Sequence, residues 1–182
     1  MQLSLYLSLV YGEGFSLYFD LLNVYYRVII NLHVKTMKIE IFKNSYNPWQ
    51  WVEQYQSEYL SKQHNFGAAT IFVGTMRDFN EGNEVRGMTL EHYPEMTHKY
   101  LQALAQKAIK RWGLVDLAIA HRVGEIEPGE SIVCVAVWSS HRKAAYEANR
   151  MIMEELKNQA PFWKKERLIS GTRWVEKNTP GF

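Results

Sequence analysis

The chain has 182 residues, which is enough for one ordinary domain with a hydrophobic core and marginal for two. Its net charge of only +2 gives no global field that would favour nucleic acid or an anionic membrane, so any electrostatic function must come from local clustering. The single cysteine, Cys134, excludes an internal disulfide framework and a multi-cysteine zinc site, and it fits a reducing cytoplasm, where we expect the protein to be located.

Residues 1–36 are apolar, but charged side chains interrupt them, so no uncharged run reaches the ~20 residues of a membrane helix. They also lack the basic start and small-residue cleavage site of a secretory signal. They are interpreted either as a poorly packed extension or as translated upstream sequence with the natural start at Met37. An alternating strand pattern begins directly at Met37 and favours the second interpretation. We therefore expect one domain over residues 37–182.

The first elements of this domain are a strand, a helix and two further strands. Apolar alternation predicts a strand over 39–42, and aromatic residues at four-residue steps predict a helix over 49–62. Alternation returns over 67–75 and 85–93. It predicts two strands, joined by a polar, glycine-containing loop over 77–84.

A helix and a third strand follow. Pro94 suits the first position of a helix, because its missing N–H would have no partner there. The apolar helical stripe runs to Trp112, and Gly113 is a plausible C-terminal stop. Residues 117–123 alternate again and predict a strand.

The last third contains the most buried strand and the longest helix. Residues 127–130 (EPGE) place proline and glycine as a type II turn requires. Residues 131–138 (SIVCVAVW) are apolar on both faces, which is typical of a central strand covered twice. A long helix is predicted over 140–159, and short strands are predicted in the tail, 164–177. This order of elements indicates an α+β fold with helices packed on a mostly antiparallel sheet.

Basic residues gather where the central strand is followed by the long helix, at 139–143 (SSHRK). Serine is a good N-cap there, but basic residues in a first turn have the wrong sign for the helix dipole. Such a local violation is expected at functional sites. Free N–H groups at the helix start, with His141 and Arg142, make an anion site. For Lys143 we prefer a solvated side chain.

A second basic group surrounds the end of the same helix. Lys157 alone has an ordinary explanation, because cations near a helix C-terminus are mildly stabilising. Lys164 and Lys165 lie just beyond it, beside two aromatic residues. A lysine amine in such surroundings can act as a nucleophile or proton carrier, and Glu166 can orient one of them. A solvated cluster is the competing interpretation.

Arg77 follows a predicted strand and enters a polar loop, where a guanidinium can hold phosphate with two parallel hydrogen bonds. Other reactive residue types have simpler explanations. Cys134 alternates with apolar residues of a buried strand and is predicted to belong to the core. His92 and His121 lack a partner at metal-ligand spacing, so no metal site is predicted.

Several segments resemble, in order and spacing, the large catalytic subunit of molybdopterin synthase over residues 66–177. They are FVGTMRDFNEG, LEHYPEMT, HRVGEIEPGE, SSHRKAAYEANRMIMEELKNQAPFWKKE and RWVE. The most specific part combines an S-[SA]-H-R helix start with a K-x-x-A-P-x-W-K helix end. The resemblance implies a fold of the α/β-hammerhead type, with a mostly antiparallel sheet and two main packed helices.

The activity implied by the resemblance is a sulfur transfer in molybdenum cofactor biosynthesis. Such subunits convert cyclic pyranopterin monophosphate into molybdopterin by adding two sulfurs as a dithiolene. Each sulfur arrives as a thiocarboxylate on the C-terminal Gly-Gly of a small ubiquitin-like partner, whose tail threads into a pocket of the large subunit. The implied assembly is a heterotetramer around a large-subunit homodimer. No cofactor, metal, nucleic acid or membrane is implied.

The resemblance also implies roles for individual residues. It makes Lys157 and Lys164 catalytic. It assigns substrate binding to Thr75, Met76, Arg77, His141, Arg142, Lys165 and Glu166. It places Phe72 and Met153 at apolar positions near the pocket. Thr75 and Met76 stand where many relatives have Lys-Val.

Helix length constrains how these residues can meet. Fixed cations suit a cyclic phosphate, and we expect Arg77, His141 and Arg142 to hold it. Lys164 would contact the thiocarboxylate or carry protons, with assistance from Lys157. Between His141 and Lys157 the helix rises ~24 Å at ~1.5 Å per residue. One pterin cannot easily touch both ends, so we predict an active site at the homodimer interface, with the His-Arg pair donated across it.

Two alternatives use the same basic cluster without catalysis. One is a nucleotide- or RNA-binding module whose basic and aromatic tail holds the ligand, although the near-neutral charge argues against it. The other is a scaffold homologue that binds the ubiquitin-like partner, although the intact lysine pair argues against it.

Overall fold

The computed structural model describes residues 37–175, so the extension predicted for residues 1–36 lies outside the described residues. The strands are β1 Met37–Phe42, β2 Ala68–Thr75, β3 Phe79–Asn80, β4 Asn83–His92, β5 Asp116–Arg122, β6 Gly124–Ile126, β7 Ser131–Ser139, β8 Phe162–Leu168 and β9 Gly171–Trp174. The helices are α3 Pro48–Tyr55, α4 Pro94–Trp112 and α5 Arg142–Gln159, and a π-helical turn, η1 Gln56–Leu60, follows α3.

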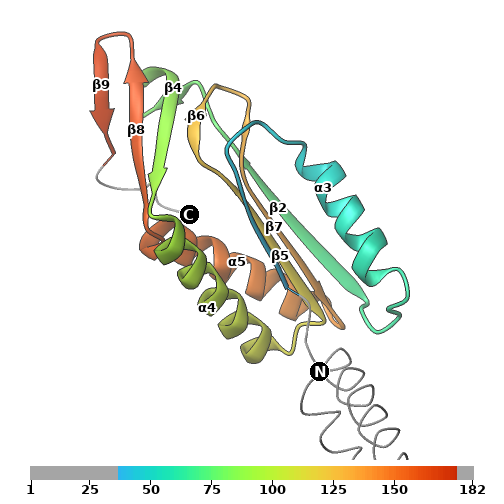
Figure 1. Ribbon diagram of the computed structural model, residues 1–182. Coiled ribbons are helices and arrows are strands. Elements are labelled where there is room, and N and C mark those ends of the chain that lie inside the picture. The colour runs from blue at the N-terminus through green and yellow to red at the C-terminus, as the bar shows by residue number, and fades with distance from the viewer. Residues whose placement is uncertain (1–36, 176–182) are drawn as a thin grey trace, which may run out of the picture. The chain divides into compact units, whose positions relative to one another are not determined.

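The strands form two sheets (Figure 1). The large sheet has the order β1-β5-β7-β2, in which β1 and β5 are parallel and the other neighbours antiparallel. The small sheet has the order β3-β4-β8-β9, with β6 also paired to β4, and all its described pairs are antiparallel. The predicted α+β class with mostly antiparallel strands is confirmed. The strands are divided between two sheets because β4 pairs with β6 and β8 rather than with β2.

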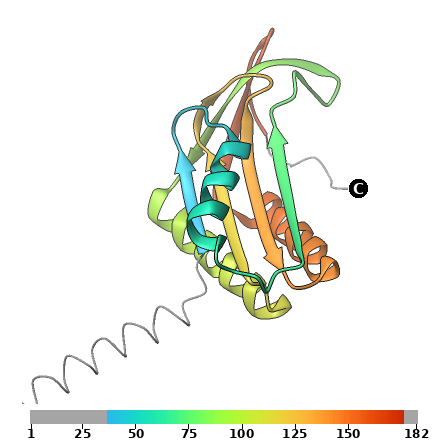
Figure 2. The same ribbon diagram turned by 90° about the vertical axis from the view of Figure 1, so that its right-hand side faces the viewer.

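The large sheet is covered on both faces (Figure 2). Leu117 and Ile119 of β5 pack into a core cluster with α4 and α5, while Ala118 and Ala120 pack with α3. β7 lies between β5 and β2, and its residues 133–139 are all buried, which confirms a central strand covered twice. Cys134 is part of this core, and burial raises the pKa of its thiol to about 12. No helix within residues 37–175 is long and apolar enough to span a membrane.

Helix and turn signals mostly determine the local boundaries. Pro94 opens α4 and Gly113 caps it in the left-handed conformation at φ 60°, as predicted. Gly129, at φ 87°, and the hydrogen bond from Glu130 N to Glu127 O at 3.1 Å confirm the predicted turn. The loop predicted over 77–84 instead contains the short hairpin β3–β4. Glu81 and Gly82 both have positive φ there, as a type I′ hairpin turn requires.

The prediction of a continuous α-helix over 49–62 is wrong in its second half. The α-helix ends at Tyr55 and continues as the π-helical turn η1. Tyr55 and Leu60 are both 2% exposed, whereas Tyr59 is 43% exposed. Burial therefore follows a five-residue step, which the wider π turn provides and an α-helix does not.

Replacing Tyr55 with Phe should destabilise the packing of α3 on the large sheet. The Tyr55 hydroxyl donates to Asp116 Oδ2 at 3.0 Å, and the Asp116 side chain is fully buried. Loss of a donor to a buried carboxylate costs about 1–3 kcal/mol, measurable by urea denaturation. Tyr59→Phe, at an exposed position of the adjoining turn, is the matched control and should change stability by less than about 0.5 kcal/mol. Equal effects of the two variants would contradict this account.

Candidate active site

A buried carboxylate organises the inner face of the small sheet. Glu166 is 3% exposed, and its Oε1 accepts a hydrogen bond from Asn80 Nδ2 at 2.8 Å. Its Oε2 accepts from Arg173 at 2.7 Å, and Lys164 Nζ lies 3.5 Å from Oε1. Burial alone would raise the pKa of Glu166, but Arg173, Lys164 and Asn80 together hold it below its usual value. The carboxylate is therefore ionised near neutral pH and fixes the Lys164 ammonium beside it.

Strand periodicity brings Lys164 and Glu166 to the same side of β8, two residues apart. They lie opposite Leu90 and Met88 of β4 in the register of the sheet. Both β4 residues belong to a buried apolar cluster. The side chain of Lys164 is 25% exposed, so its ammonium lies partly desolvated between this cluster and solvent. The ammonium is thus held at the edge of the apolar cluster, where an anionic group from solvent can reach it.

Arg77 lies in a loop that is linked to the Lys164 strand through side-chain contacts. It lies two residues after the end of β2, and its guanidinium is 4.8 Å from the centre of the Phe79 ring. The backbone of Met76 is bonded to the turn at 127–130. Its N–H donates to Glu130 O at 2.9 Å, and its carbonyl accepts from Gly129 N at 2.8 Å. Asn80, three residues after Arg77, then bonds Glu166. The Arg77 loop and Lys164 are thus linked through Asn80 and Glu166.

His141 and Arg142 lie at the opposite end of the large sheet. In the register of β2 and β7, Ala68 pairs with Ser139 and Thr75 pairs with Ser131. β2 therefore spans ~23 Å at ~3.3 Å per residue between these pairs. Arg77 follows one end of this span, and His141 follows the other. Within one chain, Arg77 therefore lies far from His141 and Arg142. These three side chains of one copy do not form a single phosphate site.

The start of α5 differs from the serine cap expected from the sequence. His141 occupies the N-cap position, and its side chain makes no capping hydrogen bond. The prediction was wrong because Ser139 remains in β7 and the Ser140 hydroxyl donates to Asn65 O at 3.0 Å. The first turn of α5 has no acidic residue, and the side chains of His141 and Arg142 are exposed. Exposed cations at a helix start that lacks a side-chain cap suit an anion.

The remaining predicted site residues are spread over several surfaces. Lys157 is an exposed residue in the last turn of α5. Lys165 alternates with Lys164 and lies on the outer face of β8, with Nζ 5.6 Å from the centre of the Trp174 ring. Phe72 is 40% exposed on β2. Thr75 is also exposed, Met76 is buried in the small-sheet cluster and Met153 is half-buried against the α4–α5 core.

Two contributors were missed by the sequence analysis. Asn80 and Arg173 complete the hydrogen bonding of Glu166, from β3 and β9 respectively. Arg173 is part of the RWVE segment, but nothing in its spacing links it to a carboxylate in the neighbouring strand. Within residues 37–175, no group of three or more His, Cys, Asp or Glu side chains is arranged to hold a metal ion.

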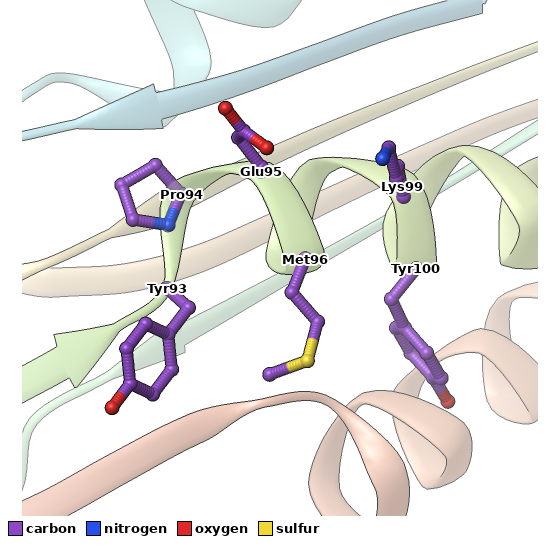
Figure 3. Close-up of a pocket in the computed structure, with 6 residues that line it drawn as sticks. All are labelled: Tyr93, Pro94, Glu95, Met96, Lys99 and Tyr100. Atoms are coloured by element: carbon purple, nitrogen blue, oxygen red, sulfur yellow. The ribbon is translucent and has the colours of Figure 1, made fainter.

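An apolar hollow lies at the start of α4 (Figure 3). Its lining residues are Tyr93, Pro94, Glu95, Met96, Lys99 and Tyr100. Figure 3 shows Tyr93, Met96 and Tyr100 projecting to one side of α4, and Glu95 and Lys99 to the other. Tyr93 also contacts Trp163 edge-on, with ring centres 5.4 Å apart. The hollow therefore adjoins the strand that carries Lys164.

The family model of the MoaE protein matches residues 46–159. The chain belongs to this family. The match includes both ends of α5, and the membership predicted from the sequence motifs is confirmed.

Similar proteins carry the name of an enzyme. A molybdopterin synthase catalytic subunit of Haemophilus ducreyi is 50% identical over 119 residues, covering 65% of this chain and 79% of the relative. One of Pseudomonas aeruginosa is 46% identical over 140 residues, covering 77% and 91%. The crystal structure of molybdopterin synthase from Staphylococcus aureus matches with a TM-score of 0.66 and 31% identity, covering 75% of this chain and 95% of that one. The complex of subunits 1 and 2 of the molybdopterin-converting factor of Helicobacter pylori matches with a TM-score of 0.64 and 27% identity, covering 78% and 92%.

Replacing Glu166 with Gln should destabilise the small sheet by about 2 kcal/mol, because a neutral amide removes the buried charge that Lys164 and Arg173 share, and leaves Arg173 with the more exposed Glu81. Glu84→Gln removes an exposed carboxylate that pairs with Arg86 in the same sheet, and should cost less than about 0.5 kcal/mol. Urea denaturation measures both.

The stabilisation by Glu166 should depend on pH. The pKa of Glu166 is lowered in the folded chain, so its contribution to stability is present above the ordinary carboxyl pKa and is lost as pH falls through the folded value. The difference from wild type should therefore shrink below pH about 4, and a pH-independent difference would contradict the ionic role.

Proposed function

We propose that this chain is the catalytic subunit of a molybdopterin synthase, which converts cyclic pyranopterin monophosphate into molybdopterin. The observation that carries the proposal is the half-buried Lys164, fixed by the buried Glu166 on a chain of the MoaE family. The names of relatives at 46–50% identity support the same activity. The reaction adds two sulfurs to the pterin as a dithiolene, and we propose the cytoplasm as its location.

The sulfur donor is a small ubiquitin-like subunit with a C-terminal Gly-Gly thiocarboxylate. The Helicobacter pylori structure, a complex of subunits 1 and 2, supports a two-subunit assembly. We propose that two copies of this chain and two copies of the partner form a heterotetramer. The partner's C-terminal tail then reaches the inner face of β8, where Lys164 lies.

The proposed roles follow from charge and position. Lys164 contacts the thiocarboxylate or carries a proton during the transfer, and Lys157 assists. Arg77, His141 and Arg142 hold the phosphate of the pterin, because fixed guanidinium and helix-terminus donors suit such an anion. Thr75, Met76, Lys165 and Glu166 complete the substrate site. Phe72 and Met153 supply apolar contacts near it.

The site is shared between two copies of the chain. Lys157 lies in the last turn of α5, and Lys164 follows the helix. His141 and Arg142 lie at the start of the helix, ~24 Å away along its axis. Arg77 is separated from the His-Arg pair by the length of β2. The β2 edge also exposes Ile71 and Phe72, each 40% accessible, and an apolar sheet edge of this kind is suited to pairing with a second copy. In a homodimer formed through this region, one copy supplies Arg77 and the lysines to a pterin, and the other copy supplies His141 and Arg142.

Lys164→Ala should lower the rate of dithiolene formation by about 100-fold, because a fixed cation is lost where charge develops. The assay combines the purified chain, the thiocarboxylated partner and the pyranopterin, and follows the dithiolene product. Lys110→Ala, in the last turn of α4, is the control and should retain the wild-type rate. No product from the wild-type chain would refute the proposed enzymatic activity and favour a non-catalytic scaffold. An unchanged rate in Lys164→Ala would refute only the assigned role.

Mixing Arg142→Ala chains with Lys164→Ala chains tests the shared site. Random reassortment should restore about a quarter of wild-type activity, because half of the dimers are mixed and each has one intact site of two. Wild-type chains mixed with the Arg142→Ala/Lys164→Ala double variant are the control. A mixed dimer of this second kind has no intact shared site, but one intact site if each site is built from one chain. No restoration in confirmed mixed dimers of the first kind would refute the shared arrangement.

A further inference from the structure

A stacked pair of aromatic rings joins the two sheets immediately before the Lys164 position. His121, near the end of β5 in the large sheet, stacks on Phe162, the first residue of β8 in the small sheet. The ring centres are 3.9 Å apart and the planes differ by 10°. His92 of β4 pairs with Phe162 across the strands, with ring centres 6.2 Å apart. Phe162 is therefore contacted from both sheets.

The imidazole of His121 is neutral in this position. The side chain is 8% exposed, and burial lowers its pKa to about 4. Its Nδ1 lies 2.8 Å from the carbonyl oxygen of Arg122, so Nδ1 carries the proton and donates. Burial of a polar ring is costly relative to an apolar side chain of similar size. The backbone hydrogen bond and the stack on Phe162 offset that cost and fix the plane of the ring.

Strand pairing with β4 begins at Phe162, the first residue of β8, whereas the turn just before the strand has few polar contacts. Pro161, immediately before it, has no N–H to donate, and its carbonyl accepts a long hydrogen bond from Thr97 Oγ1 at 3.4 Å. Phe162 N donates to Ala160 O at 2.8 Å, within the turn itself. His92 Nδ1 is buried and has no hydrogen-bond partner among residues 37–175, and the ring packs near Phe162.

Orientation of this strand decides whether Lys164 and Glu166, or instead Lys165, face the buried apolar cluster of the small sheet. Phe162, Lys164 and Glu166 alternate with Trp163 and Lys165, so the two sets lie on opposite faces of β8. A rotation or a one-residue slip would turn Lys164 and Glu166 to the outer face together and place Lys165 on the inner face. Phe162 lies on the Lys164 face, and its ring is held by the buried His121.

We propose that His121 is a positioning residue, which holds Phe162 by stacking and thereby keeps Lys164 on the inner face of β8. Its effect on reaction rate rests on the proposed function, whereas its effect on strand orientation does not. Phe162 is the side chain through which it acts. His92 supports the same ring from within the small sheet.

The test compares His121→Leu, His121→Phe and Phe162→Leu in the full chain, which is used alone for labelling and in complex with its thiocarboxylated partner for kinetics. Ile119→Ala is the matched control, because Ile119 is a buried residue on the same face of the same strand. Two quantities are measured for each variant. One is the ratio of Lys164 to Lys165 acetylation by acetic anhydride in the isolated chain, from peptide mass spectrometry. The other is kcat and KM for the pterin.

His121→Leu and Phe162→Leu should each change the acetylation ratio by about threefold or more and lower kcat about tenfold, with KM changed less than about twofold. His121→Phe keeps an aromatic ring on Phe162 and should retain kcat within about threefold. Ile119→Ala should lose stability but keep the wild-type ratio and kcat.

An unchanged acetylation ratio in both leucine variants, or the same change in Ile119→Ala, would overturn the positioning role. Phe162→Leu decides the matter if His121→Leu fails to fold. Absence of dithiolene product from the wild-type complex would refute the proposed function instead, and the acetylation ratio would still test the stack.

Discussion

The buried charge of Glu166 is the interaction on which the small sheet depends. An ionised carboxylate removed from water is stable only when hydrogen-bond donors and cations surround it. Those partners come from three strands, with Asn80 on β3, Lys164 on β8 and Arg173 on β9. The carboxylate therefore ties a two-residue strand and an edge strand to β8. The same requirement holds the loop after β2, and with it Arg77, near the proposed reactive lysine.

Helix α5 imposes the second constraint. It is amphipathic, and its buried face, including Ala148, Ile152 and Leu156, packs into the core shared with α4 and the large sheet. A helix packed along its length is rigid, so its ends stay apart. Basic residues at both ends serve one small substrate only if a second copy of the chain supplies one of them. The same long helix thus forms part of the core and, because its two ends are far apart, requires the proposed site to be shared between two copies.

Local sequence signals were reliable where one residue sets the backbone. Pro94 and Gly113 mark the ends of α4, and Gly129 marks a turn, because each has a backbone preference that neighbours cannot override. Errors arose where a distant contact decided the outcome. The π-helical turn follows the burial of Leu60, and the expected serine cap is absent because Ser140 bonds Asn65 instead.

The sequence by itself determined the family, the order of the main elements and the chemical types at the site, because motif spacing and hydrophobic periodicity are local properties of the chain. Only the tertiary structure decided that the face of β8 with Lys164 and Glu166 meets the buried cluster of β4, that Arg173 and Asn80 complete the Glu166 carboxylate, and that Arg77 lies far from His141. It also brought His121 against Phe162. These facts depend on strand register and on the packing of residues far apart in the chain. Periodicity shows that two faces of β8 differ, but the partners that each face meets belong to other strands.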